Sequence, residues 1–334
     1  MSLLNSKIIS GSLSQLAPAG TEIDSKDTVH MDDSDRETES IAQPEPESAN
    51  ERPEGFGLPE PEPDITPSRI PNFGQALLFV CFAGLMLVIS ELLLFFKGDS
   101  PVAEQGGAIS VQHPKLQLAA MAATYLTTLL AAWFFYPTVW RRSFLDGLRW
   151  HWETARRHAG KLIALGFLLA AIVQAVTYFI PAPKTMPIDD FFLTQWDAWL
   201  ITLFGTLLAP VFEETCFRGF LVPAFAIAYD WLSLPRTPEA RARWQTTATL
   251  SPAALVLSAV LSSIFFALLH AQQVAHLWAA LLVLFSVSLV LTFVRVKTDS
   301  VASSAIVHGS YNFFVFLSLM VATGGYRHLD RMTH

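Results

Sequence analysis

Polar and apolar residues are distributed very unevenly along this chain. The first 70 or so residues are mostly polar, and from Phe73 onward apolar runs of roughly 20 residues recur. As helices, runs of this length cross a bilayer core of about 30 Å. The pattern therefore predicts an all-α, polytopic transmembrane helix bundle of about seven spans. We place them at residues 73–96, 116–136, 162–180, 199–224, 253–272, 277–294 and 301–321.

The same pattern divides the chain into four parts. Residues 1–70 form a polar tail, and residues 71–195 hold the first three spans with a basic, amphipathic connection. Residues 196–323 hold the last four spans, and residues 324–334 form a short polar tail. A shorter apolar segment at 144–152 is typical of a helix that lies at the membrane interface.

The polar tail is strongly acidic. Its first 70 residues contain 15 acidic and 5 basic residues, a net charge of −10, whereas the whole chain carries −7 and the remainder therefore about +3. Stretches rich in Glu, Pro and Ser cannot bury enough apolar surface to offset chain entropy, so we expect disorder here. The tail is either a docking or regulatory arm or a solvated segment with no specific partner.

Composition and charge support a membrane protein and give its orientation. Only 15% of the residues are charged, against about 25% in soluble proteins. Basic residues gather in three connections that alternate along the chain, which predicts that these connections and the acidic tail are cytoplasmic in an inner or plasma membrane. Basic residues placed in this way do not indicate nucleic-acid binding. They are Arg141, Arg142, Arg149, Arg156, Arg157, Lys161, Arg236, Arg241, Arg243, Arg295 and Lys297.

The fourth span contains charged residues whose insertion into a bilayer is energetically unfavourable. Glu213, Glu214 and Arg218 lie within six residues of each other. Charges that persist at membrane depth usually face a partner or a cavity. Glu214 and Arg218 are four apart and can pair on one face, whereas Glu213 is rotated by about 100° and is free to meet other helices. The alternative is a buried ion-pair triad that only locks helix packing.

Two further spans carry polar groups at helical spacing. Phe266 and His270 are four residues apart near the end of the fifth span, and His308 and Asn312 are four apart in the seventh. Each pair alone is typical of a helix–helix hydrogen bond. Together with the glutamates, they bring groups suited to proton transfer or anion binding from three helices.

This combination suits the hydrolysis of an amide by water. A carboxylate and a histidine that converge on one water can deprotonate it, and a second histidine with an asparagine amide can stabilise the oxyanion. No G-x-S-x-G or H-E-x-x-H motif is present. Glu213, His270 and His308 could instead bind Zn²⁺, since two imidazoles and a carboxylate suit that ion. The residues alone leave both chemistries open.

The motifs Glu213-Glu214-x3-Arg218, Phe266-x3-His270 and His308-x3-Asn312 resemble the CPBP family of intramembrane CAAX proteases and bacteriocin-processing or immunity proteins, also called Abi. The resemblance covers roughly residues 198–321 and leaves the first three spans outside. It implies a bacterial-type endopeptidase that cuts membrane-associated proteins or peptides near their C-terminus. CAAX specificity itself is not carried over, because many bacterial members have no prenylated substrate.

The resemblance also implies roles for the motif residues. Glu213 with His270 would activate water, His308 with Asn312 would form the oxyanion site, and Glu214 and Arg218 would support them. The family is described both as metalloproteases and as glutamate proteases, and Asn312 as an amide donor favours the metal-independent type. The sequence does not name the substrate.

Two other functions are compatible with the same residues. The chain could be a non-catalytic scaffold or immunity protein of this family, or a proton-coupled transporter with a Glu/His relay.

The predicted spans place Glu213 and His308 in the cytoplasmic half and His270 toward the other face. That is a depth mismatch of about 10 Å or more. A later start of the fifth span, an interfacial piece opened by Pro252, or a tilted helix would remove it. If none of these holds, the hypothesis of a single reaction site is weakened.

Overall fold

The computed structural model describes residues 69–96, 102–105, 108–111, 113–181 and 187–330. All of them lie in a compact unit formed by Pro63–His334. The expected disorder of the acidic tail concerns residues that lie outside the described ones, apart from Arg69 and Ile70.

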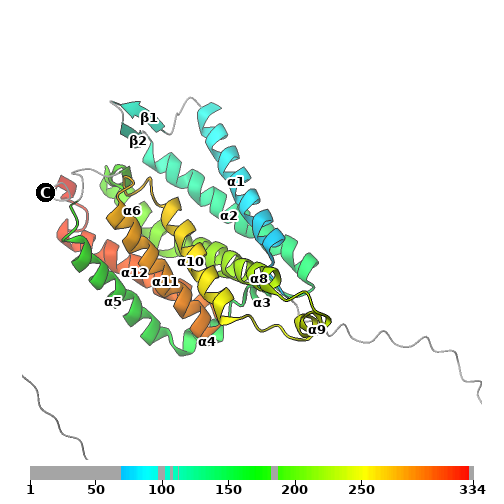
Figure 1. Ribbon diagram of the computed structural model, residues 1–334. Helices are drawn as coiled ribbons and strands as arrows, with labels where there is room; N and C mark the ends of the chain where they lie inside the picture. Colours follow the sequence, from blue (N-terminus) through cyan, green and yellow to red (C-terminus); the bar gives the residue numbers. More distant parts are fainter. Residues whose placement is uncertain (1–68, 97–101, 106–107, 112, 182–186, 331–334) are drawn as a thin grey trace, which may run out of the picture. The chain divides into compact units, whose positions relative to one another are not determined.

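Seven helices of the described residues are long and apolar enough to cross a membrane, so the predicted all-α bundle is confirmed and the protein is a multi-pass membrane protein. Figure 1 shows them side by side as a bundle. They are α1 (Phe73–Phe96), α2 (Pro114–Trp140), α5 (Ala159–Thr177), a composite helix (Gln195–Ser233), α10 (Pro252–Leu269), α11 (Trp278–Thr298) and α12 (Val301–Ala322).

Short elements cap the two ends of the bundle. At one end lie α3 (Phe144–Leu148), α4 (Trp152–Arg157) and α9 (Pro238–Thr246). We call this the basic end, because the three arginine-rich connections meet there. At the other end lie η1 (Pro187–Phe192) and an antiparallel hairpin of β1 (Val102–Gln105) and β2 (Ala108–Val111), which the sequence pattern did not indicate.

The composite helix contains two widened, π-helical turns. Its parts are α6 (Gln195–Leu203), η2 (Phe204–Leu208), α7 (Ala209–Glu214), η3 (Thr215–Leu221) and α8 (Val222–Ser233). The N–H groups of Ala209 and Val222 donate to carbonyls five residues back, and each precedes a proline, Pro210 or Pro223. A proline ring clashes with the carbonyl four residues back, and widening the preceding turn relieves that clash. The two widened turns enclose Glu213 and Glu214.

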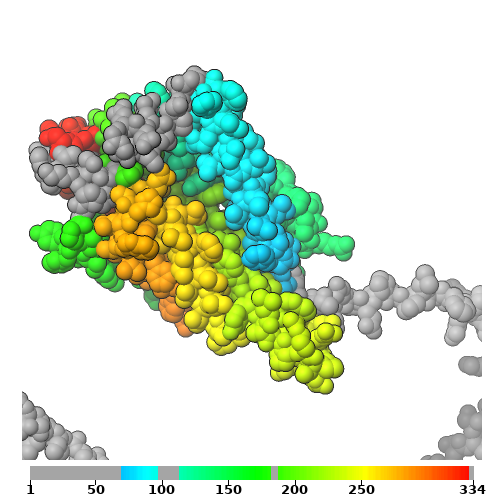
Figure 2. Space-filling model, turned by 45° about the horizontal axis from the view of Figure 1, so that its top comes forward, coloured from blue at the N-terminus to red at the C-terminus, as the bar shows by residue number. Residues whose placement is uncertain are grey.

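Close packing positions the helices around the composite helix. A Cβ on Gly166 of α5 would lie only 2.6 Å from the Val307 oxygen of α12, so these backbones touch. On the other side, Phe79 of α1 stacks on Phe220 of η3 with ring centroids 4.4 Å apart. α12 in turn approaches the composite helix closely, because a Cβ on Gly309 would lie 3.1 Å from the Thr206 oxygen of η2. Figure 2 shows the surface hollowed between α1 and α10, with the composite helix behind.

Candidate functional site

Glu213 and Glu214 separate as the helical geometry predicts. Glu214 is fully buried, and its Oε1 lies 3.0 Å from Arg218 Nη1, so the expected pair four residues apart is present. Glu213 points elsewhere and its side chain keeps 15% exposure. One carboxylate is therefore neutralised inside the bundle, while the other remains accessible.

Arg218 is also fully buried and joins three helices. Beyond its bond to Glu214, its Nη2 donates to the carbonyl and the hydroxyl of Ser288 on α11, at 2.9 and 2.8 Å. Its guanidinium lies over the ring of Phe266 on α10, 5.0 Å from the centroid. These contacts stabilise the guanidinium charge, which would be energetically unfavourable in the lipid bilayer alone.

Two histidines face the accessible carboxylate. His270 Nε2 lies 3.9 Å from Glu213 Oε2, and His308 Nε2 lies 3.8 Å from the same oxygen. The other ring nitrogens are engaged: His270 Nδ1 contacts the Phe266 carbonyl at 2.7 Å, and His308 Nδ1 contacts Glu214 Oε1 at 2.9 Å. We call Glu213, Glu214, Arg218, His270 and His308 the Glu–His cluster.

These partners determine where the imidazole protons lie. A carbonyl oxygen only accepts, so Nδ1 of His270 donates and its Nε2 is an acceptor when the ring is neutral. Glu213 Oε2 and His270 Nε2 are then two acceptors 3.9 Å apart. A water about 2.8 Å from each can donate one hydrogen to each, which is the arrangement that activates a nucleophilic water.

His308 differs from His270 in its partner. Its Nδ1–H donates to Glu214, which is paired with Arg218. Its Nε2 donates a hydrogen bond only when the ring is an imidazolium. An oxyanion-binding role for His308 therefore requires a proton on both of its ring nitrogens.

Asn312 holds the first widened turn. Its Nδ2 donates to the Gly205 carbonyl in η2 at 2.7 Å. Gly205 also allows close approach, because a Cβ there would lie 2.7 Å from the Phe316 ring. This bond uses one of the two amide N–H groups of Asn312 and leaves one for a ligand.

The expected depth mismatch of His270 is wrong. Asp230 of α8 accepts hydrogen bonds from the Ser251 N–H and hydroxyl, at 2.8 and 2.5 Å, at the start of α10. Glu213 lies 17 residues before Asp230, and His270 lies 19 residues after Ser251, so both reach nearly the same depth at about 1.5 Å per residue. The mismatch arose because the fourth span was predicted to end at residue 224, whereas its helix continues to Ser233.

The fit of a metal ion can be judged from the same atoms. Within the described part of the chain, no group of three or more His, Cys, Asp or Glu side chains is arranged to hold a metal ion. Glu213, His270 and His308, the residues that would hold Zn²⁺ if a metal were bound, do not form such a set in this arrangement.

The comparisons with known proteins bear on the part of the chain that carries the cluster. Residues 195–314 match a family model described as type II CAAX prenyl endopeptidase Rce1-like. This segment is similar to that family. The match confirms the resemblance seen in the motifs and supports an intramembrane protease in general. No curated protein and no solved structure matches the chain.

Sequence reasoning missed several residues that position the Glu–His cluster. Ser288 accepts hydrogen bonds from Arg218, and the Gly205 carbonyl accepts one from Asn312. The hydrogen bond between Asp230 and Ser251 sets the relative depth of α8 and α10. A serine in an apolar span is a weak signal, because small residues also serve helix packing.

Proposed function

We propose that this protein is an intramembrane endopeptidase in which Glu213 and His270 activate a water molecule. The observation that carries the proposal is the 3.9 Å approach of two hydrogen-bond acceptors, Glu213 Oε2 and His270 Nε2, inside an apolar bundle. Two acceptors at this distance need a donor between them, and water is the donor that hydrolysis uses.

The reaction follows from the positions of the protons. Glu213, assisted by His270, takes a proton from water as the oxygen attacks the substrate carbonyl. The imidazolium Nε2–H of His308 and the second N–H of Asn312 stabilise the oxyanion. Glu213 then passes the proton to the leaving amine, so that water adds across the peptide bond and the enzyme returns to its first state.

Glu214 and Arg218 act through His308. The two carboxylates of the cluster balance the charges of Arg218 and a protonated His308. Glu214 orients the imidazole through Nδ1, and Arg218 holds the Glu214 carboxylate in place inside the bundle. They are positioning residues, because the reacting atoms lie on the Nε2 side of the ring.

The proposed enzyme is metal-independent. Water needs no metal to bridge Glu213 and His270, and the amide of Asn312 supplies a hydrogen bond rather than a ligand. Activity of the purified protein is expected to survive a strong Zn²⁺ chelator. Loss of activity with chelator and its return with Zn²⁺ would show a metalloprotease.

The substrate is proposed to be a membrane-associated protein or peptide cut near its C-terminus. The family model is named for CAAX prenyl endopeptidases, and prenylation of this protein's own substrate is not part of the proposal. The basic end of the bundle and the acidic tail are proposed to face the cytoplasm, in keeping with the positive-inside rule.

The decisive experiment compares membrane proteomes of cells that produce the wild type, Glu213→Gln or Glu91→Gln. Glu91 is the matched control, because it is a membrane glutamate on α1 that accepts a hydrogen bond from Gln117. We expect C-terminally cleaved fragments with the wild type and Glu91→Gln, and none with Glu213→Gln. Identical fragments in all three, at equal protein levels, would leave a scaffold or a transporter as the explanation.

A further inference from the structure

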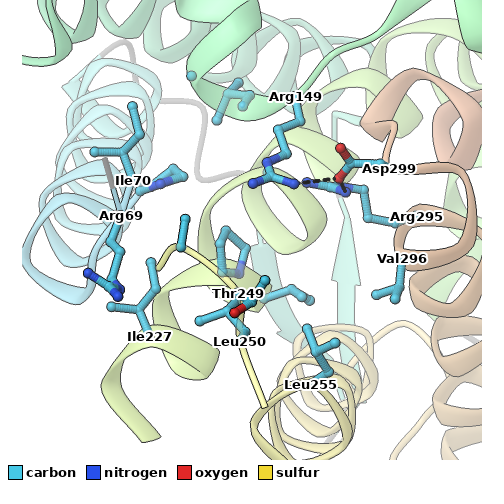
Figure 3. Close-up of a pocket in the computed structure, with 17 residues that line it drawn as sticks. Arg69, Ile70, Arg149, Ile227, Thr249, Leu250, Leu255, Arg295, Val296 and Asp299 are labelled. Carbon is cyan, nitrogen blue, oxygen red and sulfur yellow. Dashed lines mark hydrogen bonds and ion pairs between the residues drawn. The ribbon is translucent and has the colours of Figure 1, made fainter. Parts of the chain in front are cut away.

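A second polar site lies at the basic end, away from the Glu–His cluster. It is a cavity of about 380 Å³, and none of the cluster residues lines it. Its walls come from the segment before α1, from α3, η3, α8, α10 and α11, and from the segment before α10. Figure 3 shows Arg149, Arg295 and Asp299 on one side, with Arg69 across from them.

The charged side of the cavity carries an excess of positive charge. One oxygen of Asp299 accepts from both Arg149 and Arg295, at 2.8 and 3.0 Å. One carboxylate thus shares two guanidinium groups. Arg69 adds a third and lies over the Trp244 ring, 3.6 Å from its centroid. The three arginines and one aspartate leave a net charge of about +2 facing the cavity.

Arg295 has capacity for a further acceptor. Its side chain is only 9% exposed, and its buried Nε has no hydrogen-bond partner among the described residues. A buried donor left without a partner is costly. Arg295 lines the cavity, so a negatively charged group there would lie beside its guanidinium, which Asp299 engages through Nη1.

The remaining walls are apolar and lie at the membrane boundary. Ile227, Leu255 and Val296 line the cavity below the arginines, and Val296 is 41% exposed on the bundle surface. α10 begins and α11 ends beside this cavity, as expected where spans leave the bilayer. The cavity therefore combines an anion-binding edge with an apolar wall at headgroup depth.

We propose that this cavity binds the phosphate of an anionic phospholipid. The phosphate accepts hydrogen bonds from Arg295 and Arg149, and the first acyl carbons lie along Ile227, Leu255 and Val296. Basic pockets between transmembrane helices on the cytoplasmic side are suited to such headgroups. Arginine also matches the geometry of phosphate oxygens better than lysine does. The site is independent of the proposed proteolysis.

Native mass spectrometry of the full-length protein in detergent tests the proposal. The probes are phosphatidylglycerol and phosphatidylcholine with identical acyl chains, and inorganic phosphate as competitor. We expect the wild type to retain phosphatidylglycerol at least about fivefold over phosphatidylcholine. Arg295→Gln should lower this retention about tenfold.

Two more variants separate binding from folding. Lys297→Gln removes an exposed charge two residues along α11, outside the cavity, and should change retention less than about twofold. Ala248→Trp fills the cavity from an exposed loop position without changing charge, and should lower retention as Arg295→Gln does.

Three results would overturn the assignment. Equal retention of the two lipids would show that the cavity does not select charge. Equal losses in Arg295→Gln and Lys297→Gln, with no loss in Ala248→Trp, would show that general surface charge holds the lipid. Displacement of the lipid by millimolar inorganic phosphate, or by a soluble peptide with a free C-terminal carboxylate, would assign the cavity to that ligand instead.

Discussion

Replacing Arg218 by methionine tests the buried charges of the cluster. Arg218 and Glu214 are both fully buried, and Arg218→Met leaves Glu214 with His308 as its remaining charged partner. Breaking a buried ion pair by removing one partner costs about 3–5 kcal/mol, whereas replacing both charges by groups of similar volume is often close to neutral. The double variant Glu214→Gln/Arg218→Met should therefore be more stable than Arg218→Met alone.

The measurement is a double-mutant cycle by equilibrium unfolding in mixed detergent micelles. We expect a coupling free energy of about 2 kcal/mol between the two positions. Arg157→Met, at an exposed position of the basic end, is the matched control and should change the free energy of unfolding by less than about 0.5 kcal/mol. The double variant should also stay inactive, because His308 Nδ1 loses the carboxylate that orients its ring.

Additivity would refute this reasoning. If the effects of the two single variants sum to that of the double variant within about 0.5 kcal/mol, the pair does not act as a unit in the folded protein. An active double variant would contradict the positioning role of Glu214.

Three further outcomes are expected. Gly166→Val should lower the free energy of unfolding by about 1–3 kcal/mol, because the new side chain meets the α12 backbone; an unchanged unfolding curve would contradict this contact. Asn312→Ala should lower kcat about 10²-fold with little change in KM, and a raised KM with intact kcat would instead indicate substrate binding. Burial raises the pKa of Asp299, but the hydrogen bonds and charges of two neighbouring arginines outweigh this and bring it below its usual value. Since the folded-state pKa lies below the unfolded one, the stability difference between wild type and Asp299→Asn should be constant above about pH 5 and shrink below about pH 4; a change near pH 7 would contradict it.

Hydrophobic run length was sufficient to predict the bundle. Apolar segments of about 20 residues leave a helix few alternatives in a bilayer, and seven such helices are present in the described residues. The spacing of Glu214 and Arg218 likewise predicted their pair, because neighbours on one helix face depend on local geometry alone.

Features that depend on contacts between helices could not be predicted in this way. The end of the fourth span was misplaced because Asp230, which pairs with Ser251, is polar and lies beyond the apolar run. The partner of Asn312 is a carbonyl freed in a widened turn, and no side-chain pattern marks a carbonyl. Pro210 and Pro223 were visible signals of irregular turns, but their effect depends on which neighbouring helices accept the altered geometry.

The hydrogen bonds between Asp230 and Ser251 make the geometry of the Glu–His cluster independent of the length of the loop between α8 and α10. These hydrogen bonds align α8 with α10 directly. The depths of Glu213 and His270 are therefore set by the 17 and 19 helical residues that separate them from Asp230 and Ser251, and not by the loop that connects the helices. The connection can therefore grow at a small entropic cost. An affinity tag or fluorescent reporter inserted near residue 235 should leave the cluster assembled, which gives a handle for following the protein in membranes.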